Sequence, residues 1–305
     1  MEPLKYYEFE LSEKQIHDRE KLIAELKNNK TIQNFMERYD CPFEVVKDNM
    51  FRFKDWLEAL NRVHQLDEET LRDDPTRGAY VNLVYDSVAG VLLDEYKVIP
   101  TVEKLVAESA HLDQYAVFPL SKSLQEASFS VGKFDDRTLL AVDTLISFVD
   151  NDVLGYYIHG NLGVGKSYLA ACVSNEIAKR GSKVAFVSVA DLLSHLKQNF
   201  NRSYEVDHTL DNLKRVELLV IDDLGAEPIS AWGRDEVLLP LLNHRLENYR
   251  KTIFTSNYPM DMLENLYSLD QRGNFDQLRA KRFVDRIFAI SEPLLILGKN
   301  RRHNR

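Results

Sequence analysis

The sequence predicts an α/β fold with a parallel sheet over residues 137–305, preceded by a smaller α+β domain over residues 1–120. Short apolar runs alternate with helical patterns in the larger part, and this alternation predicts βαβ units with parallel strands. The run at 218–221 is continuously apolar, as expected when helices cover both faces of a sheet. A glycine-rich loop also follows one apolar run and opens a helix, which is typical of a phosphate-binding site.

The expected elements of the larger part follow in regular order. Helices are expected near 137–149, 165–180, 191–199 and 235–248. Strands are expected near 155–159, 183–189, 217–222 and 251–256.

The first 120 residues carry different patterns. Ser12 and Gln15 stand at capping-box spacing and open an expected helix over 12–30, and a second helix is expected after Asp55. Valine- and tyrosine-rich runs between residues 80 and 96 predict a small antiparallel sheet. The segment 121–136 is rich in serine, glycine and charge, so we expect the domains to be joined there.

Composition limits the class of protein. With 305 residues, two domains are expected. No apolar run approaches the ~18 residues of a membrane span, and residues 1–10 lack the pattern of a signal peptide, so a cytoplasmic protein without membrane contact is expected. Cys41 and Cys172 are far apart, which predicts free thiols.

Net charge is −9, so overall charge does not favour coating of duplex DNA. The basic stretch 299–305 is either a solvated tail or a local contact to phosphate or DNA.

The glycine-rich loop matches the phosphate-loop pattern G-x-x-x-x-G-K-[ST] at every fixed position. Its backbone N–H groups and the following helix N-terminus can converge on the phosphates of a nucleotide such as ATP. Lys166 would place a positive charge at the β- and γ-phosphates, and Ser167 would supply a hydroxyl ligand for Mg²⁺. The expected nucleotide-binding residues are Gly160, Asn161, Leu162, Gly163, Val164, Gly165, Lys166 and Ser167.

Polar residues follow two later strands. Asp222 is expected to hold Mg²⁺ through water, and Asp223 stands where a base or water-positioning carboxylate is wanted. Glu227 is an alternative for that role, and the sequence does not choose between the two. Asn257 follows the next strand and would orient a water or touch the γ-phosphate.

Three arginines recur on one expected helix, at positions 279, 282 and 286. Such exposed arginines are usually solubilising. ATPases that act as rings, however, use an arginine from the neighbouring subunit to neutralise transition-state charge.

These motifs together resemble the DnaI/DnaC family of bacterial helicase loaders, which are AAA+ ATPases, over roughly residues 120–305. The resemblance rests on segments 160–167, 218–227, 232–237, 252–257, 271–287 and 298–302. It implies a five-stranded parallel sheet with a small helical lid near 260–305. It also implies that Asn257 is the sensor residue and Arg282 the arginine finger, with Arg286 as the alternative.

The resemblance further implies the partners. These are the replicative DNA helicase, a DnaB/DnaC-type hexamer gripped by the N-terminal domain, single-stranded DNA, and further copies of the chain joined through the arginine finger. Single-stranded DNA would contact the helical insertion over 191–215, where cations alternate with aromatic rings, although an ordinary amphipathic helix and loop explain this pattern equally well. The expected contacts are Lys197, Phe200, Arg202, Tyr204 and Lys214.

One departure from the family concerns zinc. DnaI-type loaders resemble one another in a cysteine-rich zinc site in the N-terminal domain, but this domain contains Cys41 as its single cysteine, and His64 cannot complete a site with it. The expected cofactors are therefore ATP and Mg²⁺, without zinc.

Two other functions stay open. An IstB-type transposition helper shares the ATP-binding motifs. A nucleotide-gated adaptor that barely hydrolyses ATP is favoured by Asp223, because AAA+ proteins usually carry a longer glutamate there. A function intermediate between the loader and the adaptor is that of a slow ATPase whose hydrolysis a partner or DNA stimulates.

Overall fold

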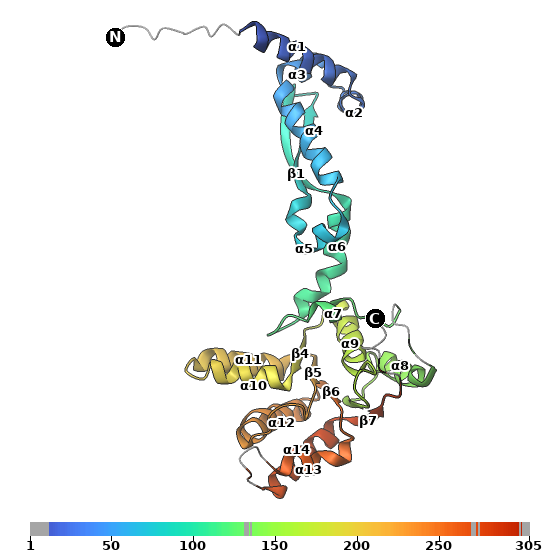
Figure 1. Cartoon of the computed structure of the whole chain (residues 1–305), viewed down its shortest axis with the longest axis vertical. Helices are drawn as coiled ribbons and strands as arrows, with labels where there is room; N and C mark the ends of the chain where they lie inside the picture. The colour runs from blue at the N-terminus through green and yellow to red at the C-terminus, as the bar shows by residue number, and fades with distance from the viewer. Residues whose placement is uncertain are drawn as a thin grey trace, which may run out of the picture. The chain divides into compact units, whose positions relative to one another are not determined.

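The computed structural model describes residues 12–130, 134, 136–269, 273, 275–298 and 300. The chain divides into two compact units, with the division after Glu108. Figure 1 traces the elements of both units along the chain.

The first unit is the expected α+β module, with more helices than the sequence patterns indicated. The capping box is confirmed, because Ser12 Oγ accepts from the N–H of Gln15 and Gln15 Oε1 accepts from the N–H of Ser12. The antiparallel sheet is confirmed as a hairpin of β1 (Ala79–Asp86) and β2 (Val91–Val98). The helices are α1 (Glu13–Asn28), α2 (Lys30–Tyr39), α3 (Phe43–Asp48), α4 (Met50–His64), α5 (Glu68–Asp73), the 3₁₀ turn η1 (Pro75–Gly78) and α6 (Pro100–Ser109).

Aromatic side chains form the core of this unit. The rings of Phe35 and Phe53 meet edge to face with centroids 5.1 Å apart, and Trp56 packs against both. The indole N–H of Trp56 also donates to Asn82 Oδ1 on β1. Burying such rings is strongly favourable, so α2 and α4 are held on the hairpin. The helix that was expected after Asp55 is α4. It begins earlier, at Met50, because Phe53 belongs to its buried face.

The second unit is an α/β module. Its strands are β3 (Gly155–His159), β4 (Val184–Ser188), β5 (Leu218–Asp222), β6 (Lys251–Ser256) and β7 (Glu292–Leu295). Its helices are η2 (Ala110–Gln114), α7 (Lys122–Gln125), α8 (Asp136–Phe148), α9 (Lys166–Lys179), α10 (Val189–Gln198), α11 (Ser203–Arg215), the π-helix η3 (Trp232–Leu238), α12 (Leu239–Glu247), η4 (Met260–Met262), α13 (Leu263–Ser268) and α14 (Gln277–Ile290).

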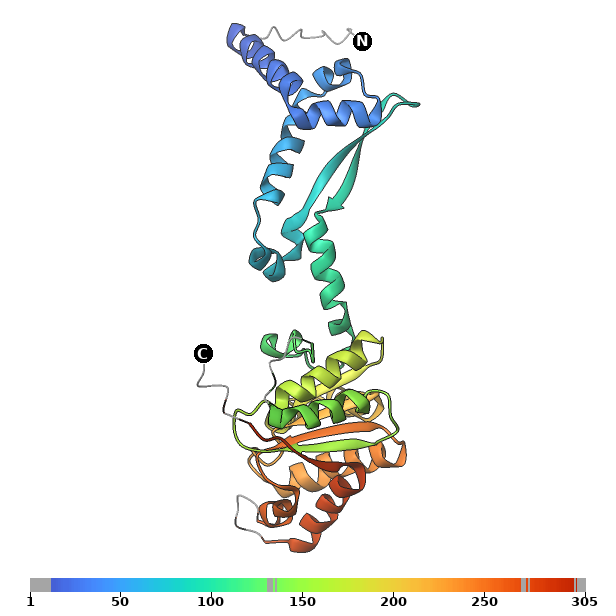
Figure 2. The same cartoon turned by 90° about the vertical axis from the view of Figure 1, so that its right-hand side faces the viewer.

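The five strands form one parallel sheet in the order β4-β5-β6-β3-β7, which confirms the expected five-stranded parallel sheet. Successive residues of β5 alternate between its faces: Leu218 and Val220 pack with α8 and α9, whereas Leu219 and Ile221 pack with α10 to α14. Figure 2 shows helices on both sides of the sheet. Both faces are covered, and this explains the continuously apolar strands.

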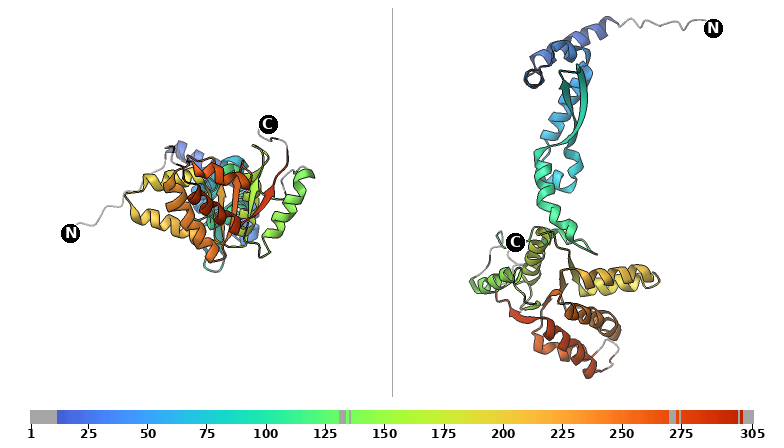
Figure 3. Two further views of the ribbon diagram at one scale, coloured as in Figure 1. Left: turned by 90° about the horizontal axis from the view of Figure 1, so that it is seen from below. Right: turned by 180° about the vertical axis from the view of Figure 1, so that it is seen from behind.

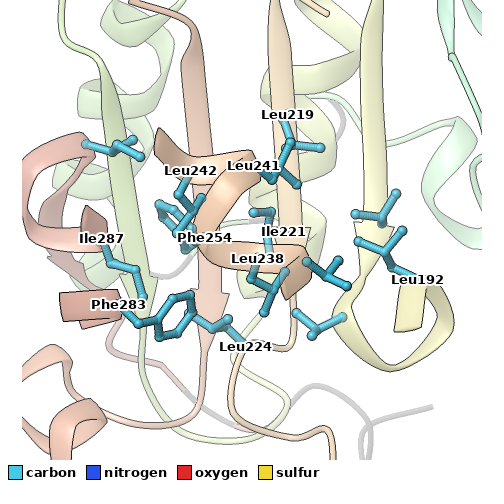
Figure 4. Close-up of a cluster of buried hydrophobic side chains, with 14 of the residues drawn as sticks. Leu192, Leu219, Ile221, Leu224, Leu238, Leu241, Leu242, Phe254, Phe283 and Ile287 are labelled. Carbon is cyan, nitrogen blue, oxygen red and sulfur yellow. The ribbon is translucent and has the colours of Figure 1, made fainter. Parts of the chain in front are cut away.

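The larger core lies on the second of these faces. Figure 4 shows Leu219, Ile221 and Phe254 of the sheet against leucines of α12 and against Phe283 and Ile287 of α14. The segment near 260–305, where a small helical lid was expected, contains helices and one strand in its described residues. The helices α13 and α14 belong to this core, and β7 follows them and pairs with β3.

The expected linker at 121–136 also differs from the structure. Its described residues belong to the second unit, because the side-chain amide of Asn175 on α9 donates to the carbonyls of Leu124, Gln125 and Ala127. These three hydrogen bonds to backbone carbonyls hold the segment on α9.

The helix expected over 235–248 consists of η3 and α12. Pro240 has no N–H to donate to the carbonyl of Glu236, four residues earlier, so regular α-helical bonding is interrupted where the π-helix ends. In Figures 1 and 3, α10 and α11 lie side by side as a helical hairpin.

Arg245 on α12 joins three elements in the interior. Its side chain is fully buried and donates to the hydroxyl of Thr252 on β6 and to the carbonyls of Leu213 and Val216 at the end of α11. A buried cation needs such partners, and these carbonyls have no helical N–H to accept from.

Arg245→Met should therefore destabilise the second unit by roughly 3 kcal/mol or more, because several buried acceptors lose their donor at once. Arg250→Met is the matched control, since Arg250 makes an exposed ion pair with Glu217 and its loss should cost less than about 1 kcal/mol. Equilibrium urea unfolding measures both changes. Equal stability of the two variants would contradict a special role for Arg245.

Candidate nucleotide-binding site

The glycine-rich loop lies between β3 and α9, as the sequence predicted. Gly165 is the N-cap of α9 with φ 104°, a conformation that glycine adopts without strain. A Cβ at Gly165 would meet nothing within 4 Å, whereas one at Gly160 would come within 2.4 Å of the carbonyl oxygen of Ile296. The loop therefore packs closely against the residue after β7 and keeps open space at the helix N-terminus.

Lys166 connects this loop to the end of β6. Its ammonium donates to Asn257 Oδ1 at 2.7 Å and to the carbonyls of Gly160 and Asn161 at 3.1 and 3.0 Å. Only 6% of the residue is exposed. Since β3 and β6 are paired neighbours, their carboxyl ends bring Lys166 and Asn257 together across 91 residues of sequence.

Asp222 ends β5 and is buried, with 8% exposed. Burial raises the pKa of its carboxyl group above the ordinary value, although the hydroxyls of Thr255 and nearby Ser167 and the charge of Lys166 act in the opposite direction. The carboxylate accepts a hydrogen bond from the hydroxyl of Thr255 on β6.

The two acids after Asp222 have different surroundings. Asp223 is exposed and adopts a left-handed conformation with φ 54°, while its N–H donates to Thr255 Oγ1 at 2.9 Å. Glu227 is buried, and its carboxylate accepts from the N–H of Gly225 and from the hydroxyl of Tyr267. Burial raises the pKa of Glu227, against these hydrogen bonds. Asp223 is thus the acid with access to solvent.

This group of residues fits a magnesium-bound nucleotide. A helix N-terminus and an ammonium suit phosphate oxygens, and a hydroxyl beside a carboxylate suits a hard cation that prefers oxygen ligands. Bound Mg²⁺ would supply charge neutralisation at the phosphates. The open side of Gly165 leaves room for a phosphate at the loop.

The three arginines of α14 are not equivalent. Arg279 makes ion pairs with Asp235 and Asp276, and Arg286 Nε donates to Asn243 Oδ1. Arg282 is exposed and makes no hydrogen bond or ion pair with the residues that the structure describes.

The residues expected at single-stranded DNA lie on the hairpin of α10 and α11. Phe200 and Tyr204 are 71% and 79% exposed. The cations are engaged with other side chains: Lys197 lies over the ring of Trp232, Arg202 pairs with Glu205, and Lys214 pairs with Asp211. Segment 191–215 contains four basic and four acidic residues, so its net charge adds no attraction for DNA.

Nearly all of the basic stretch 299–305 lies outside the described part of the chain, because only residue 300 of it is described. Residues 1–11 also lie outside that part.

No cluster of metal-binding side chains occurs among the described residues. Burial raises the pKa of the Cys41 thiol, and His64 Nδ1 donates to the carbonyl of Leu60 on its own helix. The absence of zinc stays a prediction. No helix in the described ranges is long and apolar enough to cross a membrane.

Sequence reasoning missed Thr255, Ser256 and Tyr267. Thr255 donates to Asp222 and accepts from Asp223, and Ser256 Oγ donates to the carbonyl of Leu224. Two adjacent hydroxyl residues after the apolar pair Ile253 and Phe254 of a buried strand are the signal that could have identified the first two. Tyr267 gave no such signal.

The strand order, with a phosphate loop after β3 and an acidic pair after β5, defines an ATP-binding protein of the AAA+ P-loop class. The chain belongs to the family of IstB-like ATP binding proteins, whose family model matches residues 62–304.

Known relatives agree with this assignment. The replicative helicase loader DnaI of Bacillus subtilis (strain 168) is 26% identical over 293 residues, which are 93% of each chain. The replicative helicase loader DnaC of Escherichia coli (strain K12) is 30% identical over 118 residues, 38% of this chain and about half (48%) of the relative. A crystal structure from Streptococcus pyogenes serotype M3, solved as a candidate primosome component, is 25% identical with a TM-score of 0.51, and the match covers 64% of this chain and 98% of that one.

Thr255→Val should lower ATP hydrolysis by roughly tenfold, because one hydroxyl holds both the buried carboxylate of Asp222 and the backbone of Asp223. Thr255→Ser keeps the hydroxyl and should retain most of the activity. Steady-state rates with Mg²⁺ and ATP compare the two. Equal loss in both variants would mean that the methyl group, not the hydroxyl, matters.

Proposed function

We propose that this chain is an ATP-dependent loader of the replicative DNA helicase, acting in primosome assembly at initiation and restart of replication. The observation that carries the proposal is the similarity to DnaI over 93% of both chains, which includes the first unit as well as the ATP site. A protein that shared only the ATPase module would match over the second unit alone.

In this proposal ATP binds with Mg²⁺ at the loop after β3. Lys166 neutralises the β- and γ-phosphates, Ser167 and Asp222 hold the metal ion, and Asn257 contacts the γ-phosphate or orients water. Asp223 positions the attacking water. Its exposure favours it over Glu227, whose carboxylate is occupied by Gly225 and Tyr267.

Arg282 serves the ATP site of a neighbouring copy. Arg279 and Arg286 are engaged within their own chain, and Arg282 is exposed on the same helix. An arginine finger has to leave its own subunit's surface unpaired so that its guanidinium can reach the transferred phosphate of another.

The first unit grips the helicase, and the α10–α11 hairpin contacts single-stranded DNA. The large aromatic core of the first unit supports a fold that needs no zinc. In the hairpin, Phe200 and Tyr204 would stack on bases, whereas Lys197, Arg202 and Lys214 would have to exchange their present partners for phosphates.

Two alternatives lead to different results. The family name favours an IstB-type transposition helper, which would act without the helicase. The short carboxylate of Asp223 favours a nucleotide-gated adaptor, which would bind ATP and partners with little hydrolysis.

Lys166→Ala should lose helicase loading and at least about a hundredfold of ATP hydrolysis, because it removes the ammonium that the loop holds beside Asn257 at the proposed phosphate site. The measurement is transfer of the cell's own replicative hexamer onto circular single-stranded DNA, together with ATP turnover. Lys179→Ala, at the exposed far end of the same helix, is the control and should keep both activities. Loading that persists in Lys166→Ala would refute the proposal. Hydrolysis without any capture of the helicase would favour the transposition helper.

Arg282→Ala should bind ATP normally yet hydrolyse it poorly, by roughly a hundredfold or more, since the guanidinium acts on the neighbour's transition state. Mixing it with Lys166→Ala should restore part of the activity, because one mixed interface then has an intact loop and an intact finger. Arg286→Ala is the matched comparison and should stay active. A mixture as inactive as its components, in oligomers that still form, would exclude the role in trans.

A further inference from the structure

The loop after β5 makes a tight turn that presents Asp223. Asp223 and Gly225 both adopt left-handed conformations, with φ 54° and 89°. A Cβ at Gly225 would lie 2.7 Å from the side chain of Leu266, so the turn packs directly on α13. Asp tolerates the left-handed conformation at a cost of about 1 kcal/mol. Such a conformation persists where surrounding contacts hold the backbone in place.

Glu227 supplies one of these contacts. Its Oε2 accepts from the N–H of Gly225 at 2.7 Å, inside the turn itself. Its Oε1 accepts from the hydroxyl of Tyr267 on α13. Glu227 and Tyr267 are 6% and 1% exposed, so neither hydrogen bond competes with bulk water.

Tyr267 is itself fixed by further contacts to α14. Its ring meets Phe283 with centroids 4.8 Å apart, and its carbonyl accepts from the guanidinium of Arg234 at 2.7 Å. Arg234 pairs with Asp235, and Asp235 pairs with Arg279 on α14. A continuous set of contacts therefore runs from the turn at Asp223 to the helix that carries Arg282.

The need to fill space does not explain a carboxylate at this place. An apolar side chain of similar volume would fill the space without the cost of burying an acid. It would, however, leave the N–H of Gly225 and the hydroxyl of Tyr267 without acceptors and the turn without its inner hydrogen bond. The carboxylate of Glu227 thus selects one conformation of the turn.

We propose that Glu227 is a positioning residue for ATP hydrolysis, whose buried carboxylate holds the Asp223 turn in its active conformation and ties it through Tyr267 to α13 and α14. The inference rests on the proposed ATPase function and assigns Glu227 no contact with the nucleotide or the water.

The test uses Tyr267→Phe, which removes the hydroxyl and keeps the ring on Phe283. With the full chain, helicase and single-stranded DNA, kcat should fall roughly fivefold while KM for ATP changes little, and the urea unfolding midpoint should fall about as far as in the control variant. Tyr115→Phe is the matched control, because it removes another tyrosine hydroxyl, partly buried and bonded to Asn175 at 2.6 Å, and should keep kcat.

Glu227→Gln provides a second, independent variant. Its carbonyl can still accept from the N–H of Gly225, but one carboxylate acceptor is replaced by an amide donor, so a similar loss of kcat is expected. The double variant with Tyr267→Phe should be no slower than the slower single variant, because both changes break one interaction.

The results for these variants distinguish a positioning role of Glu227 from a general destabilisation of the fold. If the wild type hydrolyses ATP and Tyr267→Phe matches it within about twofold, the positioning role is wrong. Additive losses in the double variant, or a loss of kcat accompanied by a higher KM and a larger loss of stability than in Tyr115→Phe, would indicate general loosening and overturn it as well. A wild type that hydrolyses no ATP with helicase and DNA present would refute the proposed function itself, and the inference with it.

Discussion

The carboxylate of Asp222 sits at the end of a strand whose other residues are apolar and covered on both faces. An acid in such a place is costly unless a donor meets it. The hydroxyl of Thr255 on β6 donates to it, and Ser167 at the start of α9 lies nearby. The surroundings of this one buried carboxylate therefore bring together the phosphate loop, β5 and β6.

The strand order makes this convergence possible. β6 lies between β3 and β5, so the residues that end it can reach both the phosphate loop and the acidic pair. Asn257 reaches Lys166, and Thr255 reaches both Asp222 and Asp223. Ligand sites of open parallel sheets lie beyond the carboxyl ends of the strands for the same reason. The helices α13 and α14 then extend the site, because they pack on the face of the sheet next to the turn at Asp223.

Different kinds of contact stabilise the two units. The second buries continuous apolar strands between two layers of helices and uses Arg245 to neutralise the end of α11. The first has a two-stranded hairpin with one packed face, which is marginal by itself, and depends on a group of aromatic rings for its core. That difference fits a division of labour in which the second unit binds nucleotide on a rigid framework.

The sequence by itself determined the parallel sheet, the phosphate loop and the acidic pair, because each is encoded within a few consecutive residues. Strand β7 was not identified from its own residues, since four residues on an edge carry too little pattern. The sequence also left Glu227 open as an alternative to Asp223, and Arg286 as an alternative to Arg282. Only the tertiary structure shows that their surroundings differ, because it buries Glu227 against Tyr267 and places Arg286 beside Asn243. Those partners lie some 40 residues away in the chain, and a side chain's access to solvent depends on which distant segment packs over it.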